Sequence, residues 1–129
     1  MAITNIVSVS SIYAGNAAWA LTTGLTTTLF TAGSDVTVKI NSIIAANTSA
    51  TVVTNLTLSI FGLTTSQTGV TIGSGQTDIM IAAALPVPGS DVLSVIDRPI
   101  YLMENDILQG GASVATCDLL VSYEVINDA

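Results

Sequence analysis

The chain has 129 residues, half of them apolar and only 9% charged, with two basic and nine acidic side chains and a net charge of −7. Lys39 and Arg98 cannot form a basic patch, and an acidic chain repels phosphates, which argues against nucleic-acid binding. Thr, Ser or Asn interrupts every apolar run before the roughly 18 residues that a membrane-spanning helix needs, which excludes a transmembrane helix.

We expect one domain over residues 1–129, because 13.1 kDa suits a single core and no linker interrupts the sequence. A folded protein of this mass exposes on the order of 6,400 Å², which so few charged side chains cannot cover. The outside must therefore be mostly Thr, Ser, Asn and Ala, or be covered by other copies of the protein. The first residues lack the positive charge of a signal peptide, so the mature protein is expected to begin near residue 1 or 2.

The N-terminal third predicts two strands. Residues 3–13 alternate loosely and stop at the turn signal Ala14-Gly15-Asn16. This predicts an edge strand or, over residues 1–20, an extended arm on a neighbouring subunit. Trp19 is expected to fill the core or an interface, with a sugar-stacking platform as the alternative. The β-branched residues 26–30 predict the next strand.

The segment from residue 35 to residue 61 has the clearest pattern. Apolar and polar residues alternate over 36–41 and again over 52–60. Between them, residues 45–50 contain Asn and Ser, which bond the local backbone in turns. We therefore predict a β-hairpin, or two neighbouring strands of one sheet, in the middle of an all-β domain.

Residues 62–77 are polar and glycine-spaced, which predicts an exposed loop with one short strand at 70–72. The glycines lack the Gly-Lys-Ser/Thr ending of a phosphate-binding loop. The segment 78–85 is apolar after Asp78 and runs into Pro86-Val87-Pro88-Gly89. This favours a strand entering a proline turn over a short helix. Residues 92–96 predict a further strand.

The last third predicts a hairpin and a final strand. Two short strands within 100–109 flank the polar turn Glu104-Asn105-Asp106, and Gly110-Gly111 ends the second of them. The final strand is predicted over 117–126. Its first residue is the only cysteine, Cys117, which cannot form an intrachain disulfide and is expected to be a small buried hydrophobic residue.

These segments add up to about 8–10 short strands separated by turn signals, without a long amphipathic helix. They predict an all-β fold, an antiparallel β-sandwich with a jelly-roll-like arrangement.

Carboxylates are the only reactive side chains in quantity. Glu104 and Asp106 are two residues apart, with Asp97 upstream, which favours a turn rich in Asn and Asp and leaves a Ca²⁺ site as the alternative. Histidine is absent, which excludes His-dependent triads and clustered Cys/His zinc sites. The chain is also small for a glycosidase. We therefore expect no catalytic, cofactor-binding or metal-binding residues and no enzymatic activity.

One pattern extends over most of the chain from residue 35 onward. An Asn/Ser turn follows the strand at 36–47, a proline-led turn precedes residues 95–102, an acidic turn occupies 104–106, and a last strand follows at 119–124. This pattern, clearest from residue 90 to residue 126, resembles small virion structural proteins of tailed bacteriophages, including those of cyanobacterial phages.

The resemblance implies a β-sandwich on the virion surface, as a capsid decoration or cement protein that oligomerises and stabilises the shell. It implies as partners further copies of the chain, with a trimer favoured, and the major capsid protein or other virion proteins. A tail- or fibre-associated virion protein is the alternative within this class. A carbohydrate- or calcium-dependent binding module, with Trp19 or the Glu104 to Asp106 turn as its site, is the alternative from another class.

Overall fold

The computed structural model describes residues 11–63, 66–67, 70–71 and 75–127. Over these residues the chain is all-β and has no helix, as the sequence predicts. The eleven strands that the described residues form are β1 (Ser11–Ala20), β2 (Thr27–Thr31), β3 (Val36–Asn47), β4 (Thr54–Phe61), β5 (Ser66–Gln67), β6 (Val70–Thr71), β7 (Ile79–Val87), β8 (Val92–Ile96), β9 (Ile100–Leu102), β10 (Ile107–Ala112) and β11 (Cys117–Asn127).

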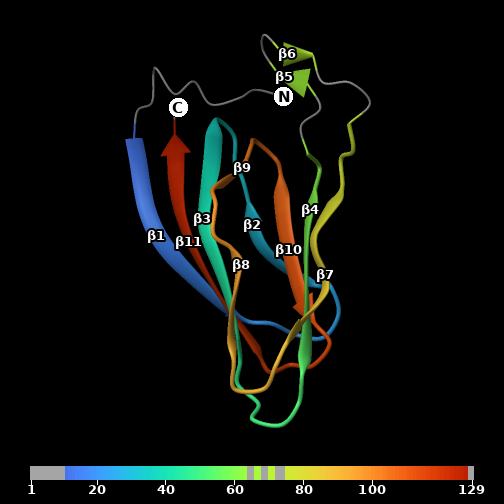
Figure 1. The fold of residues 1–129 in the computed structure, drawn as a ribbon. Helices are drawn as coiled ribbons and strands as arrows, with labels where there is room; N and C mark the ends of the chain where they lie inside the picture. The colour runs from blue at the N-terminus through green and yellow to red at the C-terminus, as the bar shows by residue number, and fades with distance from the viewer. Residues whose placement is uncertain (1–10, 64–65, 68–69, 72–74, 128–129) are drawn as a thin grey trace.

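A five-stranded and a four-stranded antiparallel sheet pack face to face (Figure 1). The first has the order β1-β11-β3-β8, with β9 also paired to β3, and the second has the order β2-β10-β4-β7. Along the chain the pairing is nested, because β1 pairs with β11, β2 with β10, β3 with β8 and β9, and β4 with β7. Nested antiparallel pairing split over two sheets is the jelly roll, which confirms the predicted β-sandwich.

The core lies between the inward faces of the two sheets, where alternate residues of each strand are buried. On β3 the alternation changes phase, because Ile40 and Ile43 are both fully buried. The pairing of β3 with β11 shifts by one residue between Ser122 and Tyr123, and this bulge turns the next side chains over. Among the described residues, the buried apolar ones are Leu21, Leu29, Ala32, Val38, Ile40, Ile43, Ala45, Leu56, Leu58, Ile60, Ala82, Val87, Leu102, Leu108, Ala112, Cys117, Leu119 and Val121.

The two predicted hairpins are wrong. β3 and β4 lie in different sheets, and residues 48–53 cross between the layers at the lower end of the view in Figure 1. β9 and β10 also lie in different sheets, so the turn at 104–106 is a second crossing. In a sandwich both layers bury one face of every strand, so an alternating pattern identifies a strand without identifying its neighbour.

β1 and β10 run through glycines that were expected to end them. At Gly15 a Cβ would come within 2.9 Å of the Tyr123 hydroxyl oxygen, so this glycine makes room for an aromatic ring within the strand. β10 continues to its end at Ala112. At Gly111 a Cβ would overlap the carbonyl oxygen of Gly24, because the β1–β2 loop crosses directly over β10 there.

Of the two alternatives for the N-terminal segment, residues 11–20 form the edge strand and not the arm, because they form β1 and pair with β11 over their whole length at the edge of the sheet. Residues 1–10 lie outside the described residues.

The short strand predicted at 70–72 is present as β6, which pairs with β5, and Ile72 lies outside the described residues. The strand expected after residue 78 is β7, and it continues through Pro86 instead of turning there. β7 is an edge strand, where a missing N–H donor is tolerated.

Two loops and the end of β7 converge at the lower end of the sandwich on the side chain of Asn47, which is only 4% exposed. Its Nδ2 donates to the carbonyl oxygens of Val52 at 2.6 Å and Val87 at 2.9 Å. Its Oδ1 accepts from the N–H of Ser49 at 3.0 Å and from the hydroxyl of Thr116 at 2.8 Å. These four bonds use both donors and both acceptor positions of the amide. They tie the loop after β3 to the end of β7 and to the loop before β11.

Replacing this amide should weaken the whole sandwich. Asn47→Ala is expected to lower the free energy of unfolding by about 2–4 kcal/mol, because it leaves the buried Val87 carbonyl and three part-buried groups without this hydrogen bond. Urea unfolding followed by far-ultraviolet circular dichroism measures the change. Asn55→Ala, at a half-exposed position on β4, serves as the control. Equal urea midpoints for the two variants would show that Asn47 has no such role.

The close approach of the β1–β2 loop to β10 predicts that Gly111 cannot be replaced without loss of stability. Gly111→Ala should destabilise the fold by about 2 kcal/mol or more, because the added methyl group meets rigid backbone at Gly24. Gly33→Ala is the matched control, since a Cβ there has nothing within 4 Å, and it should change stability by less than about 0.5 kcal/mol. A thermal melt of both variants separates the two outcomes, and similar melting temperatures would contradict the crossing.

Candidate interaction surfaces

The acidic turn between β9 and β10 packs against the loop between β2 and β3. Asn105 has a φ of 70°, a left-handed conformation that asparagine tolerates. Its N–H donates to the carbonyl oxygen of Ala32 at 2.8 Å. Asp106 is 1% exposed, and its Oδ2 accepts from the N–H of Met103 at 2.9 Å. The turn residues are therefore placed by backbone hydrogen bonds, as expected for Asn and Asp.

Glu104 adds a second contact between the same two loops, since its Oε2 accepts from the N–H of Asp35 at 3.4 Å. Asp97 lies exposed on the link between β8 and β9, next to the exposed Arg98. Within the part of the chain that the structure describes, no three His, Cys, Asp or Glu side chains gather closely enough to hold a metal ion. Glu104 and Asp106 take part in the backbone hydrogen bonds of this turn and of the β2–β3 loop.

Trp19 belongs to an aromatic cluster that spans the two sheets on the side of β1 and β2. Its ring meets Phe30 of β2 edge to face, with centroids 5.4 Å apart. Phe30 in turn meets Tyr123 of β11 edge to face at 5.0 Å. All three rings pack against the core and are partly buried. Such pairs add to the burial energy of the rings, so Trp19 closes one side of the sandwich.

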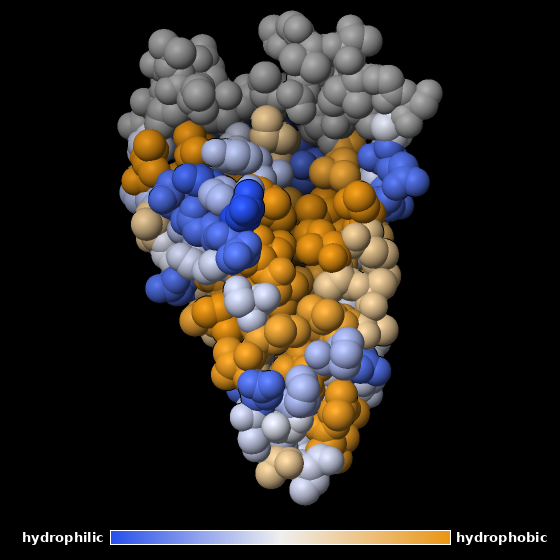
Figure 2. All heavy atoms as spheres, viewed as in Figure 1, coloured by the Kyte–Doolittle hydropathy of each residue, from blue (hydrophilic) through white to orange (hydrophobic). Residues whose placement is uncertain are grey.

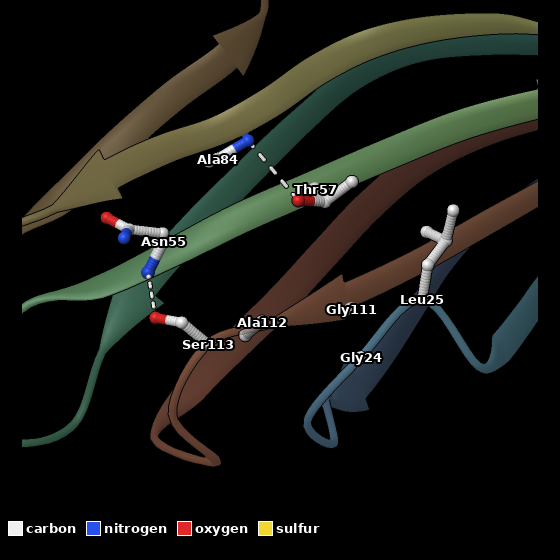
Figure 3. A pocket seen from close by; sticks show the side chains of 8 residues that line it. All are labelled: Gly24, Leu25, Asn55, Thr57, Ala84, Gly111, Ala112 and Ser113. Carbon is white, nitrogen blue, oxygen red and sulfur yellow. Dashed lines mark hydrogen bonds between the residues drawn. The ribbon is translucent and has the colours of Figure 1, made fainter.

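A shallow pocket of about 230 Å³ lies on the outer face of the four-stranded sheet (Figure 3). The Oγ of Ser113 accepts from the Asn55 N–H at 2.9 Å, and the Oγ1 of Thr57 accepts from the Ala84 N–H at 3.2 Å. No lining side chain is ionisable or aromatic. The pocket therefore lacks an acid, a base and an aromatic ring on which a sugar could stack. Its lining residues are Gly24, Leu25, Asn55, Thr57, Ala84, Gly111, Ala112 and Ser113.

The opposite side of the sandwich, between β7 and β8, has no aromatic closure among the described residues and presents a continuous apolar band (Figure 2). Ile79 and Met80 at the start of β7 are 45% and 51% exposed, and Val92 at the start of β8 is 62% exposed. The edge strands add partly buried side chains that also pack against the core. These are Ile81 and Leu85 of β7, Leu93, Val95 and Ile96 of β8, and Ile100 of β9.

We call the side chains of β7, β8 and β9 named above the apolar band. Sequence reasoning predicted the strands that carry it but did not single it out as a surface. The signal was present, because residues 79–85 form an unbroken apolar run. A strand that is apolar on both faces is typical of a sheet whose two faces are both covered by other parts of the protein. Within the described residues, the core covers one face of β7 and leaves the other face exposed.

Searches of protein-family models, curated proteins and solved structures find no match to this chain. In the described part of the chain there is no helix that could cross a membrane. The fold and its surfaces are therefore the basis for any functional proposal.

Cys117 is buried at the start of β11, as predicted, with 1% of its surface exposed. Burial raises the pKa of its thiol, and the neighbouring Asp118 carboxylate raises the pKa further. Since only the thiolate is nucleophilic, this cysteine fits a packing role.

The raised pKa of Cys117 makes stability depend on pH in the alkaline range. The unfolded thiol has a pKa of about 8.5, so above that pH the folded state binds more protons than the unfolded state. The free energy of unfolding should then fall as the pH rises from about 8.5 towards the folded pKa. Chemical unfolding of wild type and Cys117→Ala between pH 7.5 and 9.5 measures this, and parallel pH profiles would contradict it.

Proposed function

We propose that this chain is a non-enzymatic bacteriophage virion structural protein, a capsid decoration or cement protein that binds the outside of the shell and stabilises it. The observation that carries the proposal is the exposed apolar band along one side of a charge-poor jelly roll. Single exposed apolar residues are ordinary, but a contiguous band indicates an interaction surface. Jelly rolls are also a recurrent architecture of viral capsid domains.

The scarcity of charge supports a role in assembly. Two basic and nine acidic side chains leave most of the surface to small and uncharged residues. Such a surface loses little hydration energy when it is covered, and it immobilises few long side chains. The chain has few side chains that support hydrolytic or redox catalysis, since it has no histidine and its one cysteine is buried.

The proposal also names partners and a location. The partners are the major capsid protein, contacted through the apolar band, and further copies of this chain, for which a symmetric homo-oligomer is the usual form. The location is the surface of the virion. A tail- or fibre-associated position is the variant within this proposal, and the particle to which the protein binds distinguishes the two.

The test measures binding of the purified protein to shells assembled without it. Wild type should bind shells saturably and raise their melting temperature. Val92→Lys puts a charge at the most exposed point of the apolar band and should weaken binding at least about tenfold, which corresponds to about 1.4 kcal/mol. Thr28→Lys, at an exposed position on β2 away from the band, should bind like wild type.

Two results would overturn the proposal: wild type that is recovered entirely in the unbound fraction, and two lysine variants that bind alike. Binding to tails and never to shells would replace the decoration role with the tail-associated variant. A melting temperature that rises with Ca²⁺ or with a glycan, in the absence of any particle, would favour the binding-module alternative instead.

A further inference from the structure

The two sheets end in four edges within the described residues, at β1 and at β8 with β9 in one sheet, and at β2 and β7 in the other. An edge strand presents unpaired backbone N–H and C=O groups and so can pair with a strand of another molecule. Proteins prevent this with short strands, proline, bulges and charged residues. The four edges differ in how far they are protected in this way.

Three edges carry such protection. β7 contains Pro86, a left-handed residue at Ala84 (φ 51°) and register shifts in its pairing with β4. β8 and β9 are five and three residues long, and a register shift interrupts the pairing of β8 with β3. β2 has five residues and a register shift against β10. None of these edges offers a long, regular ladder.

β1 carries none of these devices. It has ten residues, which extend about 34 Å, and contains neither proline nor a charged residue. It pairs with β11 in one continuous register from Ser11 to Ala20 without a bulge. Its outward residues Ile12, Ala14, Asn16 and Ala18 are exposed. In the part of the chain that the structure describes, nothing pairs with its other side.

We infer that β1 pairs antiparallel with β1 of a second copy of this chain, across a two-fold axis, and joins two five-stranded sheets into one. A two-fold interface brings the same strand of each copy together in antiparallel orientation. The net charge of −7 makes copies repel one another, and an uncharged strand lets them meet without opposing like charges. The apolar band lies on the other side of the sandwich and remains available for the shell.

The alternation of side chains restricts the register. Directly opposed residues of an antiparallel pair point to the same face, so an outward residue must face an outward residue. A register with Asn16 on the axis pairs residues 12–20 of both copies. It sets Tyr13, which is 63% exposed, opposite the partner's Trp19 and extends the aromatic cluster by cross-strand contacts.

Disulfide trapping tests this pairing with the full chain. In Asn16→Cys the new cysteine faces its own copy across the axis, with Cα atoms about 4.5–5.5 Å apart, which suits a disulfide. Ser94→Cys, exposed on β8 at the opposite edge of the same sheet, is the matched control. The remaining cysteine, Cys117, is buried. Under mild oxidation we expect Asn16→Cys to form a disulfide dimer at least tenfold faster than Ser94→Cys.

A second pair of variants tests the register. Ala14 faces the partner's Ala18 in the inferred pairing, so Ala14→Cys and Ala18→Cys should cross-link when mixed and only slowly when each is alone. Asn16→Lys places two like charges on the axis and should abolish dimers in sedimentation at concentrations where Ser94→Lys still dimerises. Circular dichroism verifies that each variant is folded.

Equal cross-linking of Asn16→Cys and Ser94→Cys would overturn the inference, as would dimers that persist in Asn16→Lys. A cyclic trimer that is insensitive to Asn16→Lys would also overturn it. Shell binding and its loss in Val92→Lys are measured separately, so the strand pairing can fail while the proposed function stands, and the reverse also holds.

Discussion

The fold depends on one constraint, that each sheet must bury its apolar face against the other. The described residues contain no helix that could cover a sheet, and the single cysteine rules out an intrachain disulfide. Burial between the layers, at roughly 25 cal/mol per Å² of apolar surface, is therefore the main favourable contribution to stability. Fully buried side chains such as Ile43 on β3 and Leu58 on β4 come from opposite sheets, and both belong to this core.

The ends of the sandwich make the strand order specific. At one end, Asn47 bonds the Val52 and Val87 carbonyls and the Thr116 hydroxyl, which are far apart in the sequence. At the same end, Gly111 lets the β1–β2 loop lie directly on β10. At the other end, the Glu104 to Asp106 turn is bonded to the β2–β3 loop. Each contact joins connections that cross between the layers. Together they distinguish the jelly-roll order from other pairings with the same buried faces.

The two sides of the sandwich differ in a way that suits a repeating assembly. An aromatic cluster of Trp19, Phe30 and Tyr123 closes the side of β1 and β2, beside the regular edge of β1. The other side presents the apolar band between edges that proline and bulges protect from strand pairing. One side therefore suits pairing through backbone hydrogen bonds, and the other suits docking through side chains. In the proposed assembly, the apolar band would contact the shell while β1 contacts a neighbouring copy.

The sequence by itself determined the all-β class, the positions of most strands, the burial of Cys117 and the absence of histidine chemistry, because alternation and residue type are local properties. Only the tertiary structure decided that β3 and β4 belong to different sheets and that β1 continues through Gly15. It also decided that Asn47 joins two loops to the end of β7. The physical reason is that backbone hydrogen-bonding groups are the same in every strand. The alternation of apolar residues therefore identifies which face of a strand is buried. Which strand pairs with it depends on packing and on loop contacts between residues that are distant in the sequence.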